Sequence, residues 1–451
     1  MLNLICISLD SMACSLKTPS AKSMSSISRI GLPRKSSYVC ESCLGRVRQL
    51  RITRLATSRG ITSLSSKSPL PRNRMPRIAN DRQWVQESHN RWNTPRKLST
   101  NASAASLEIA EHGLAPVPSR RLISLSGPDA AKFLQGLITN NVEKNRDAPF
   151  YAAFLDARGR VLWDVFVWVY PGLDVEEGEW ACNIEVDGEE IGALLKHLKR
   201  HKLRSKISIK TIEESEISVW AGWGLSSNDD VKGAQVLATL VDPRGHKFGT
   251  RYLLKGHSSL KNPPVPIVDT QQYHLRRYVY GIPEGPNEIP REAALPMEYN
   301  IDLSQGIDFK KGCYVGQELT IRTKHTGVVR KRVLPLELQP LTKSGDQTAD
   351  APIRTFPESG TDIKQLDESM SLKKGRPAGK FIAGIGNVGL GLARLEMMTS
   401  MRVSAEGGTW KPGTRFGVPV GDEEVVEVRA ITPQWFQERE RDLWDKNRTR
   451  V

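Results

Sequence analysis

The sequence predicts an α+β fold followed by a small all-β domain. Between about residues 107 and 332, short β-rich segments alternate with helical patterns. The β-rich segments follow one another too closely for repeated βαβ crossovers, which argues against a Rossmann-type parallel sheet. From about residue 333 to 435 the chain consists mostly of short strand-like runs with glycine turns. That pattern indicates a β-barrel or sandwich at the C-terminal end.

The first 98 residues are predicted to be a targeting leader rather than a folded domain. Residues 1–100 carry 18 Lys and Arg against four acids, whereas the rest of the chain carries 47 basic and 46 acidic residues. An Arg- and Ser-rich, acid-poor segment is typical of a mitochondrial transit peptide. Because Arg96 stands three residues before Ser99, we expect a mature start between about Thr62 and Ser106. A disordered basic arm that binds RNA or membrane is the alternative.

The composition excludes several other classes of protein. The chain after residue 100, called the body here, is nearly neutral. This disfavours a nucleic-acid binder, which would carry its excess of basic residues on the folded domain. No uncharged apolar run approaches the roughly 18 residues that a membrane-spanning helix needs. Four of the six cysteines lie in the leader, so we expect Cys182 and Cys313 of the body to be reduced thiols. Cys40 and Cys43 form a lone CxxC pair, which is too few ligands for a closed zinc site.

The folded region is expected to begin near Leu107 with a helix and a hairpin. Ser126–Asp129 has the pattern of a capped helix start, and apolar residues follow at helical spacing from Ala130 to Ile138. Two β-rich segments, 151–155 and 160–170, are joined by the turn-forming residues Asp156–Gly159.

Asp164 is the exceptional residue of the second strand. Both faces of the segment 160–170 are apolar, so we expect this strand in the interior of a sheet. A carboxylate among such neighbours is costly unless it is paired or hydrogen-bonded. Asp164 is therefore expected either to satisfy a backbone or Arg partner or to lie in a ligand cleft.

Further elements follow from periodicity and composition. Residues 187–201 and 434–447 read as helices, and strands are expected at 207–212 and 217–220. Residues 341–380 lack periodicity and are predicted to be a disordered insertion in the C-terminal domain, and residues 436–451 a polar tail. Gly384–Gly389 fits the dinucleotide fingerprint by letter, but its glycines continue into a strand-like segment. A glycine-bent β segment is therefore expected there instead.

The most informative motif is Lys311–Glu318, which reads KGCYVGQE. Gly312 and Gly316 bracket a Cys and a Tyr, which indicates a tight connection and close backbone approach to a ligand. Nearby positive charge could lower the pKa of the Cys313 thiol and attract an acidic substrate tail. A structural turn with one buried, inert Cys is the alternative. The cationic neighbours are Lys310, Lys311, Arg322, Lys324 and His325.

KGCYVGQE resembles the signature of the folate-binding iron–sulfur assembly proteins, which are similar in fold to the aminomethyltransferase (T-protein) of the glycine cleavage system. Together with the leader, it resembles the mitochondrial branch of that family. Weaker matches extend the resemblance over about residues 115–435. They are Phe133–Gly136, Thr139-Asn140, Gly159-Arg160, Asp242–Arg244 and Gly391–Ala393.

The resemblance implies a ring of α+β subdomains with a C-terminal β-barrel and a central channel that binds tetrahydrofolate. It implies a mitochondrial matrix factor that assists maturation of [4Fe–4S] proteins together with A-type scaffold proteins. The cofactor-binding residues that it implies are Asp164, Arg277, Tyr280, Gly312, Tyr314 and Gly316. The residues implied for chemistry are Cys313 as the functional thiol, with Lys311, Gln317 and Glu318. Cys313 could also ligate an iron–sulfur cluster transiently.

The chain departs from the transferase pattern at two points. Aminomethyltransferases carry two adjacent acids where this chain reads Trp163-Asp164, and they lack the Cys of the signature. These departures argue against aminomethyl transfer and favour a non-catalytic or thiol-dependent assembly role. A folate-dependent one-carbon transferase that uses Asp164, and an RNA-modification factor, stay open as alternatives.

Overall fold

The structure is a computed structural model that describes residues 109–173, 179–225, 236–256, 263–341, 353, 355–404, 407–421 and 424–448. The described residues belong to one unit of the chain, Lys97–Val451. The leader predicted over residues 1–98, with its CxxC pair, lies outside the described residues.

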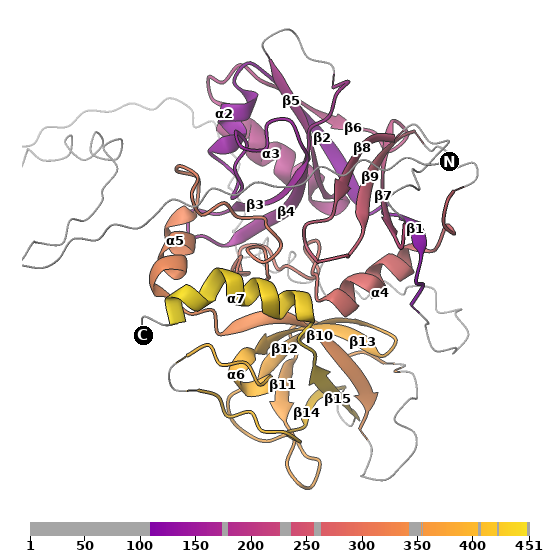
Figure 1. Ribbon diagram of the computed structural model, residues 1–451, viewed down its shortest axis with the longest axis vertical. Helices are drawn as coiled ribbons and strands as arrows, with labels where there is room; N and C mark the ends of the chain where they lie inside the picture. Colours follow the sequence, from indigo (N-terminus) through magenta and orange to yellow (C-terminus); the bar gives the residue numbers. More distant parts are fainter. Residues whose placement is uncertain are drawn as a thin grey trace, which may run out of the picture. The chain divides into compact units, whose positions relative to one another are not determined.

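A five-stranded antiparallel sheet forms the first subdomain, in the order β3-β4-β5-β2-β6 (Figure 1). Its strands are β2 Arg120–Gly127, β3 Phe150–Leu155, β4 Val161–Trp168, β5 Trp180–Asp187 and β6 Ser208–Ile212. Helices α2 Ala130–Gln135 and α3 Ile191–Lys202 pack on one face, and the short 3-10 helix η2 Gly188–Glu190 precedes α3.

Strand β4 lies inside this sheet, between β3 and β5, and all eight of its residues are buried. Trp163, Val165 and Val167 pack in the core under the two helices. Phe166 and Trp168 belong to a different hydrophobic core, and alternation places Asp164 on their face. The prediction of an interior strand is confirmed.

The first helix begins later and ends earlier than the sequence predicts. Ser126 belongs to β2, where it pairs with residues of both β5 and β6. The helix starts after Asp129, whose carboxylate accepts a hydrogen bond from the Lys206 backbone N–H at 2.7 Å and makes no capping bond. The predicted Ser126 cap is wrong because strand pairing on both sides of Ser126 extends β2 over this residue.

The second subdomain is a four-stranded antiparallel sheet in the order β1-β7-β9-β8. Its strands are β1 Gly113–Pro116, β7 Ile217–Trp223, β8 Val236–Val241 and β9 Thr250–Lys255. Helix α4, Thr270–Tyr280, follows and is capped by Asp269, which accepts a hydrogen bond from the Gln271 N–H at 2.6 Å. A long connection then leads to helix α5, Gln317–Thr326, which begins inside the signature.

The C-terminal domain is a closed barrel in the strand order β10-β13-β12-β11-β14-β15. This arrangement confirms the predicted barrel. The glycine motif forms the β12–β13 hairpin, in which Gly384 pairs with Gly389, so the expected β structure is also confirmed. Helix α6, Leu395–Met398, follows β13. The barrel strands are β10 Lys331–Pro340, β11 Asp362–Gln365, β12 Gly379–Ile385, β13 Val388–Arg394, β14 Phe416–Val420 and β15 Glu424–Ala430.

The insertion predicted over 341–380 is too long, because β11 and the start of β12 fall within it. Residues 342–352 and 354 lie outside the described residues. In β11 only Ile363 is buried, so the sequence of this barrel strand is mostly polar. Because β11 carries so few apolar residues, the hydrophobic pattern of the sequence does not reveal this strand.

Helix α7, Gln434–Arg448, confirms the helix predicted at 434–447 but not the polar tail predicted at 436–451. Trp435, Phe436 and Trp444 are buried, and the Trp444 indole N–H donates to the Asp302 carboxylate at 3.0 Å. α7 contacts α5, and Figure 1 shows these two helices side by side. None of the helices in the described segments combines the length and the apolar character needed to cross a membrane.

Candidate functional site

The KGCYVGQE signature forms a loop that leads into α5 and packs against the turn between β3 and β4. Gly316 has φ +81°, a left-handed conformation that favours glycine. A Cβ atom on Gly316 would lie 2.3 Å from the Asp156 carbonyl oxygen and 3.2 Å from the Cα of Gly159. Gly159, also at φ +81°, packs in turn against the carbonyl oxygen of Gly316. The two glycines therefore permit direct backbone contact between the signature and the hairpin turn.

Lys311 points into the protein and fixes the loop from behind. Its Nζ donates to the carbonyl oxygens of Gln135, Ile138 and Asn140 at 2.7, 2.7 and 2.8 Å, and it lies 4.8 Å from the centre of the Tyr314 ring. Burial lowers the pKa of Lys311 to about 7, while bonding to three carbonyl oxygens favours the charged form. Lys311 thus holds the loop in position, and the exposed cation beside the signature is its neighbour Lys310.

Backbone and side-chain bonds join the segment 133–140 to the segment 305–318. The Val315 N–H donates to the Gly136 carbonyl at 3.1 Å, and the Asp308 N–H donates to the Thr139 carbonyl at 3.1 Å. The Thr139 hydroxyl donates to the Gly306 carbonyl at 2.6 Å. Motifs that are far apart in the sequence therefore form one structural unit.

Cys313 lies at the exposed tip of this loop, whereas Cys182 is fully buried in β5. The neighbouring Gly312 is also exposed, and Tyr314 is buried. Burial raises the pKa of the Cys182 thiol far above its ordinary value. Cys313 is therefore not the buried cysteine of the alternative interpretation, whereas Cys182 is buried; a chemical role for the Cys313 thiol stays a prediction.

Gln317 and Glu318 lie in the first turn of α5. The Gln317 side-chain oxygen accepts a hydrogen bond from the Tyr314 N–H at 3.4 Å. Glu318 is exposed, and a negative charge at this position is favourable beside the positive end of the helix dipole. Both positions support the start of the helix, and a chemical role for either residue stays a prediction.

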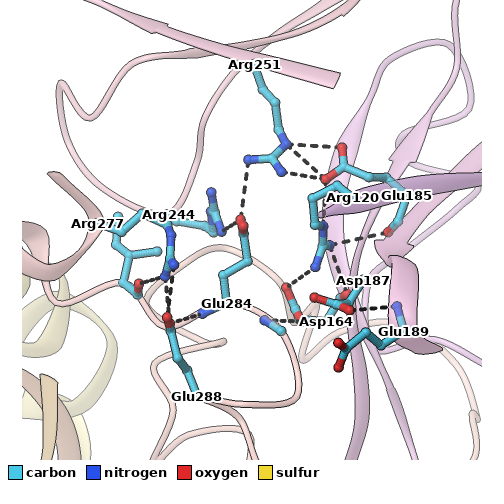
Figure 2. A network of polar contacts seen from close by, with 12 residues as sticks. Arg120, Asp164, Glu185, Asp187, Glu189, Arg244, Arg251, Arg277, Glu284 and Glu288 are labelled. Atoms are coloured by element: carbon cyan, nitrogen blue, oxygen red, sulfur yellow. Dashed lines mark hydrogen bonds and ion pairs between the residues drawn. The ribbon is translucent and has the colours of Figure 1, made fainter. Parts of the chain in front are cut away.

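Asp164 belongs to a buried network of ion pairs (Figure 2). Its Oδ2 lies 3.3 Å from Nη1 of Arg120, and its Oδ1 accepts a hydrogen bond from the Gly285 N–H at 3.0 Å. Asp164 is 4% exposed. Of the two roles that the sequence left open, the structure shows the paired carboxylate.

Glu185 and Glu284 are the other acidic centres of this network. Glu185 accepts hydrogen bonds from Arg120 at 2.9 Å and from Arg251 at 2.6 Å, and Glu284 pairs with Arg244 at 2.7 Å. Figure 2 shows Arg251 reaching toward both carboxylates. Burial alone would raise the pKa of Glu284, but the surrounding guanidinium groups hold it well below its usual range.

Sequence reasoning missed this network because its charged residues lie far apart along the chain. Arg120 and Glu185 stand in segments with strand-like alternation, where a single charged residue usually faces solvent. Their burial depends on a second sheet that covers this face, and periodicity carries no information about that packing.

The residues expected to bind the cofactor do not gather at one place. Arg277 is buried and makes two hydrogen bonds to the Glu288 carboxylate, at 2.6 and 2.9 Å. Tyr280 lines a separate cavity beside Lys247. The other expected residues belong to the signature loop, and the contacts described for this loop do not include the Arg277–Glu288 pair. They are Gly312, Tyr314 and Gly316.

A cavity of about 640 Å³ lies next to the signature, within the size range of small-molecule sites. Tyr151 is in its wall, and the side chains of Lys144 and Lys310 are exposed at its edge. Behind the wall, Arg244 lies 5.7 Å from the centre of the Tyr151 ring. Neither Asp164 nor Arg277 lines this cavity. In the described part of the chain, no group of three or more His, Cys, Asp or Glu side chains is arranged to hold a metal ion.

Comparison with known proteins agrees with this architecture. Residues 330–438 match the family described as the CAF17 C-terminal β-barrel domain. The chain is 51% identical over 358 residues to the mitochondrial iron–sulfur cluster assembly factor IBA57 homolog of Phaeosphaeria nodorum, covering 78% of this chain and 86% of that protein. The chain belongs to the IBA57 family. The IBA57 homolog of Coccidioides immitis is 43% identical over 383 residues, covering 76% of this chain and 89% of that protein.

Membership of the IBA57 family confirms the resemblance on which the sequence analysis relied. These relatives are named mitochondrial, which confirms the expected mitochondrial localisation. Among solved structures, the chain is similar to the glycine cleavage system aminomethyltransferase T of Bartonella henselae. The TM-score is 0.47 at 15% identity, over 73% of this chain and 87% of that one.

The substitution Glu185→Gln is expected to lower the free energy of unfolding by about 3–5 kcal/mol, because it leaves Arg120 and Arg251 buried without their shared countercharge. Urea denaturation would measure the change. Glu337→Gln is the matched control, since its partner Arg429 lies at the surface, and it should cost less than about 1 kcal/mol. Equal small losses in both variants would contradict a structural role for the network.

The substitution Lys311→Gln is expected to cost about 1.5–3 kcal/mol, because a charged donor to three carbonyl oxygens is lost. Hydrogen exchange should accelerate at the backbone amides of residues 135–140 and 312–318. Lys310→Gln changes an exposed lysine in the same loop and should leave both measurements unchanged. If both substitutions have the same effect, Lys311 does not position the loop.

Proposed function

We propose that this chain is a mitochondrial matrix factor that assists maturation of [4Fe–4S] proteins through the thiol of Cys313. The observation that carries the proposal is an exposed cysteine on a loop fixed by the half-buried, hydrogen-bonded ammonium of Lys311 and by Gly316. Membership of the IBA57 family supports it, since the relatives are named iron–sulfur cluster assembly factors.

A thiolate at the tip of a fixed loop suits transfer or transient binding of an iron–sulfur cluster, because clusters are held by cysteine thiolates. In the described part of the chain the other cysteine, Cys182, is fully buried. Cys313 can therefore supply one ligand, and a partner has to supply the others. A-type scaffold proteins, which the family resemblance implies, are the proposed partners, and the cluster is their shared cargo.

The same proposal assigns tetrahydrofolate to the cavity of about 640 Å³ beside the signature. The pterin ring would rest against the wall that contains Tyr151. Burial and the nearby Asp164 carboxylate raise the pKa of Tyr151 well above its ordinary value, so the phenol stays protonated and can donate a hydrogen bond. The exposed ammonium groups of Lys144 and Lys310 would attract the carboxylates of the glutamate tail.

A non-catalytic role for the folate is favoured over one-carbon transfer. A carboxylate that assists proton transfer has to reach the reacting group within hydrogen-bond distance. Both carboxylate oxygens of Asp164 are occupied, one by Arg120 and the other by the Gly285 N–H. Asp164 is also buried and does not line the cavity assigned to the folate, so it lies out of reach of a folate bound there.

The substitution Cys313→Ser is expected to leave folding and folate binding intact while it abolishes the support of [4Fe–4S] enzymes in cells. Aconitase-type activity in mitochondria from cells that carry only the variant would measure the loss. Cys182→Ala, a change in the buried cysteine, should cost about 1 kcal/mol of stability without a selective loss of aconitase activity.

In the folded protein at neutral pH, iodoacetamide should alkylate Cys313 faster than Cys182, since only the former is exposed.

Normal aconitase activity in the Cys313→Ser variant would show that the thiol has no essential chemistry.

Tetrahydrofolate is expected to bind directly, with heat measurable by calorimetry. The double substitution Lys144→Gln and Lys310→Gln should weaken binding of a tetrahydrofolate triglutamate about three- to tenfold at low salt and the monoglutamate less, since each exposed charge contributes little. Lys199→Gln, an exposed lysine on α3 outside this cavity, is the matched control. No heat and no thermal shift at millimolar tetrahydrofolate would exclude the folate assignment while leaving the Cys313 test unaffected.

A further inference from the structure

A second cavity, of about 510 Å³, lies between the end of α4, the turn before β9 and the start of α7. Tyr280 and Trp435 provide aromatic walls, His246 and Lys247 provide basic groups, and Gln434 and Glu438 provide polar groups. None of these residues lines the cavity beside the signature. The mechanism proposed above uses none of them.

The two aromatic rings are held from behind. The guanidinium of Arg276 lies 4.9 Å from the centre of the Tyr280 ring, and Phe248 packs edge-on to the same ring at 5.2 Å. Arg439 lies 5.4 Å from the centre of the Trp435 ring. Rings fixed in this way can receive a flat ligand with little loss of side-chain entropy.

The indole N–H of Trp435 is buried and has no hydrogen-bond partner among the described residues. Trp435 is 7% exposed. Buried Trp N–H groups usually find a partner, and an unpaired buried donor is costly. Trp435 lines the cavity, so an acceptor atom on a ligand there is the kind of group that would pair with this donor.

The basic groups stand on a rigid turn. Lys247 has φ +55°, a left-handed conformation that is uncommon for a residue other than glycine. Arg276 holds this turn by donating to the carbonyl oxygens of Lys247 at 3.0 Å and Phe248 at 2.7 Å. The side chains of His246 and Lys247 are exposed, and no ion pair to Lys247 is found among the described residues. The turn therefore presents to the cavity a lysine that makes no ion pair in the described part of the chain.

An acceptor lies opposite on α7. Glu438 Oε1 accepts a hydrogen bond from the Gln434 side-chain amide at 2.8 Å. A carboxylate carries about four acceptor sites, so Glu438 keeps the capacity to accept from a ligand amino group.

We propose that this cavity binds an amino-substituted heteroaromatic ring that carries an anionic group. The ring packs against Tyr280 and Trp435, and its exocyclic amine donates to Glu438. The anionic group pairs with Lys247. Purine nucleoside monophosphates and folates both have this chemistry, and the test separates these two sources.

The proposed site is distinct from the folate cavity but shares a wall element with it. Arg439 lines the folate cavity, where it donates to the Pro243 and Leu303 carbonyl oxygens at 2.6 and 2.7 Å, and it stacks on Trp435 of the second cavity. Helix α7 thus contributes its first turns to one cavity and its later turns to the other.

Calorimetry of the full chain with AMP, GMP and folic acid tests the proposal. Lys247→Gln and Trp435→Phe are expected to weaken binding of the responsive probe about tenfold each, because each removes one ligand contact. Lys199→Gln, an exposed lysine on α3 that lines neither cavity, is the matched control and should leave this affinity unchanged, whereas Lys144→Gln reports on the other cavity. Thermal unfolding of each variant without probe checks that the fold is intact.

Binding of AMP or GMP with this pattern would support the site and identify a nucleotide, whereas a second equivalent of folic acid with this pattern would support it and identify a folate. No binding of any probe at millimolar concentration would overturn the proposal. Binding of a single equivalent of folic acid would also overturn the proposal if Lys144→Gln and Lys247→Gln weakened that binding equally. One molecule would then span both cavities. The Cys313→Ser test does not depend on these outcomes.

Discussion

The buried pair between Glu185 and Arg251 is the interaction on which the arrangement of the two sheets depends. Glu185 lies on β5 of the first sheet and Arg251 on β9 of the second, and both side chains are buried. Arg120 on β2 and the Trp168 indole donate to the same carboxylate, at 2.9 and 3.0 Å. Charges removed from water in this way are stable only with good geometry and fully satisfied partners. A relative shift of the sheets would leave these charges unpaired, so the network selects one arrangement.

That arrangement also positions the long connection before the signature. The Gly285 N–H bonds Asp164 on β4, and Glu284 pairs with Arg244. Further along the connection, Asp302 pairs through both carboxylate oxygens with Arg332 at the start of β10, at 2.8 and 2.9 Å. Just after Asp302, the carbonyl oxygens of residues 305 and 306 accept the hydrogen bonds from the side chains of 139–140 that join this connection to the segment behind the signature loop. The exposed position of Cys313 therefore depends on buried charges that are distant from it in sequence.

The sequence predicts those parts of the molecule that local patterns determine. The nearly continuous apolar run of β4, the Asp156–Gly159 turn and the glycine hairpin of the barrel are local features. The exposure of Cys313 and the inward direction of Lys311 are not, because both depend on contacts with residues 135–140. Ser126 illustrates the same limit, since pairing of β2 on two sides outweighs a local helix-capping pattern.

In the sequence, Trp163-Asp164 suggests that one of two neighbouring acids of a single site has been lost. The structure changes this interpretation. Adjacent residues of a strand point to opposite faces, so Trp163 and Asp164 cannot share a site. Trp163 packs under the helices, where its indole N–H donates to Glu190 at 2.8 Å and Arg291 lies 4.7 Å from its ring. An acid at position 163 would face that layer and not the interior network.

Replacement of an acid by Trp163 therefore does not remove a carboxylate from the face that carries Asp164. The stronger argument against transferase chemistry is that Asp164 is buried in a network of ion pairs and does not line the cavity beside the signature. In this chain Asp164 is a structural anchor, and the exposed thiol of Cys313 lies on the signature loop that this anchor helps to hold.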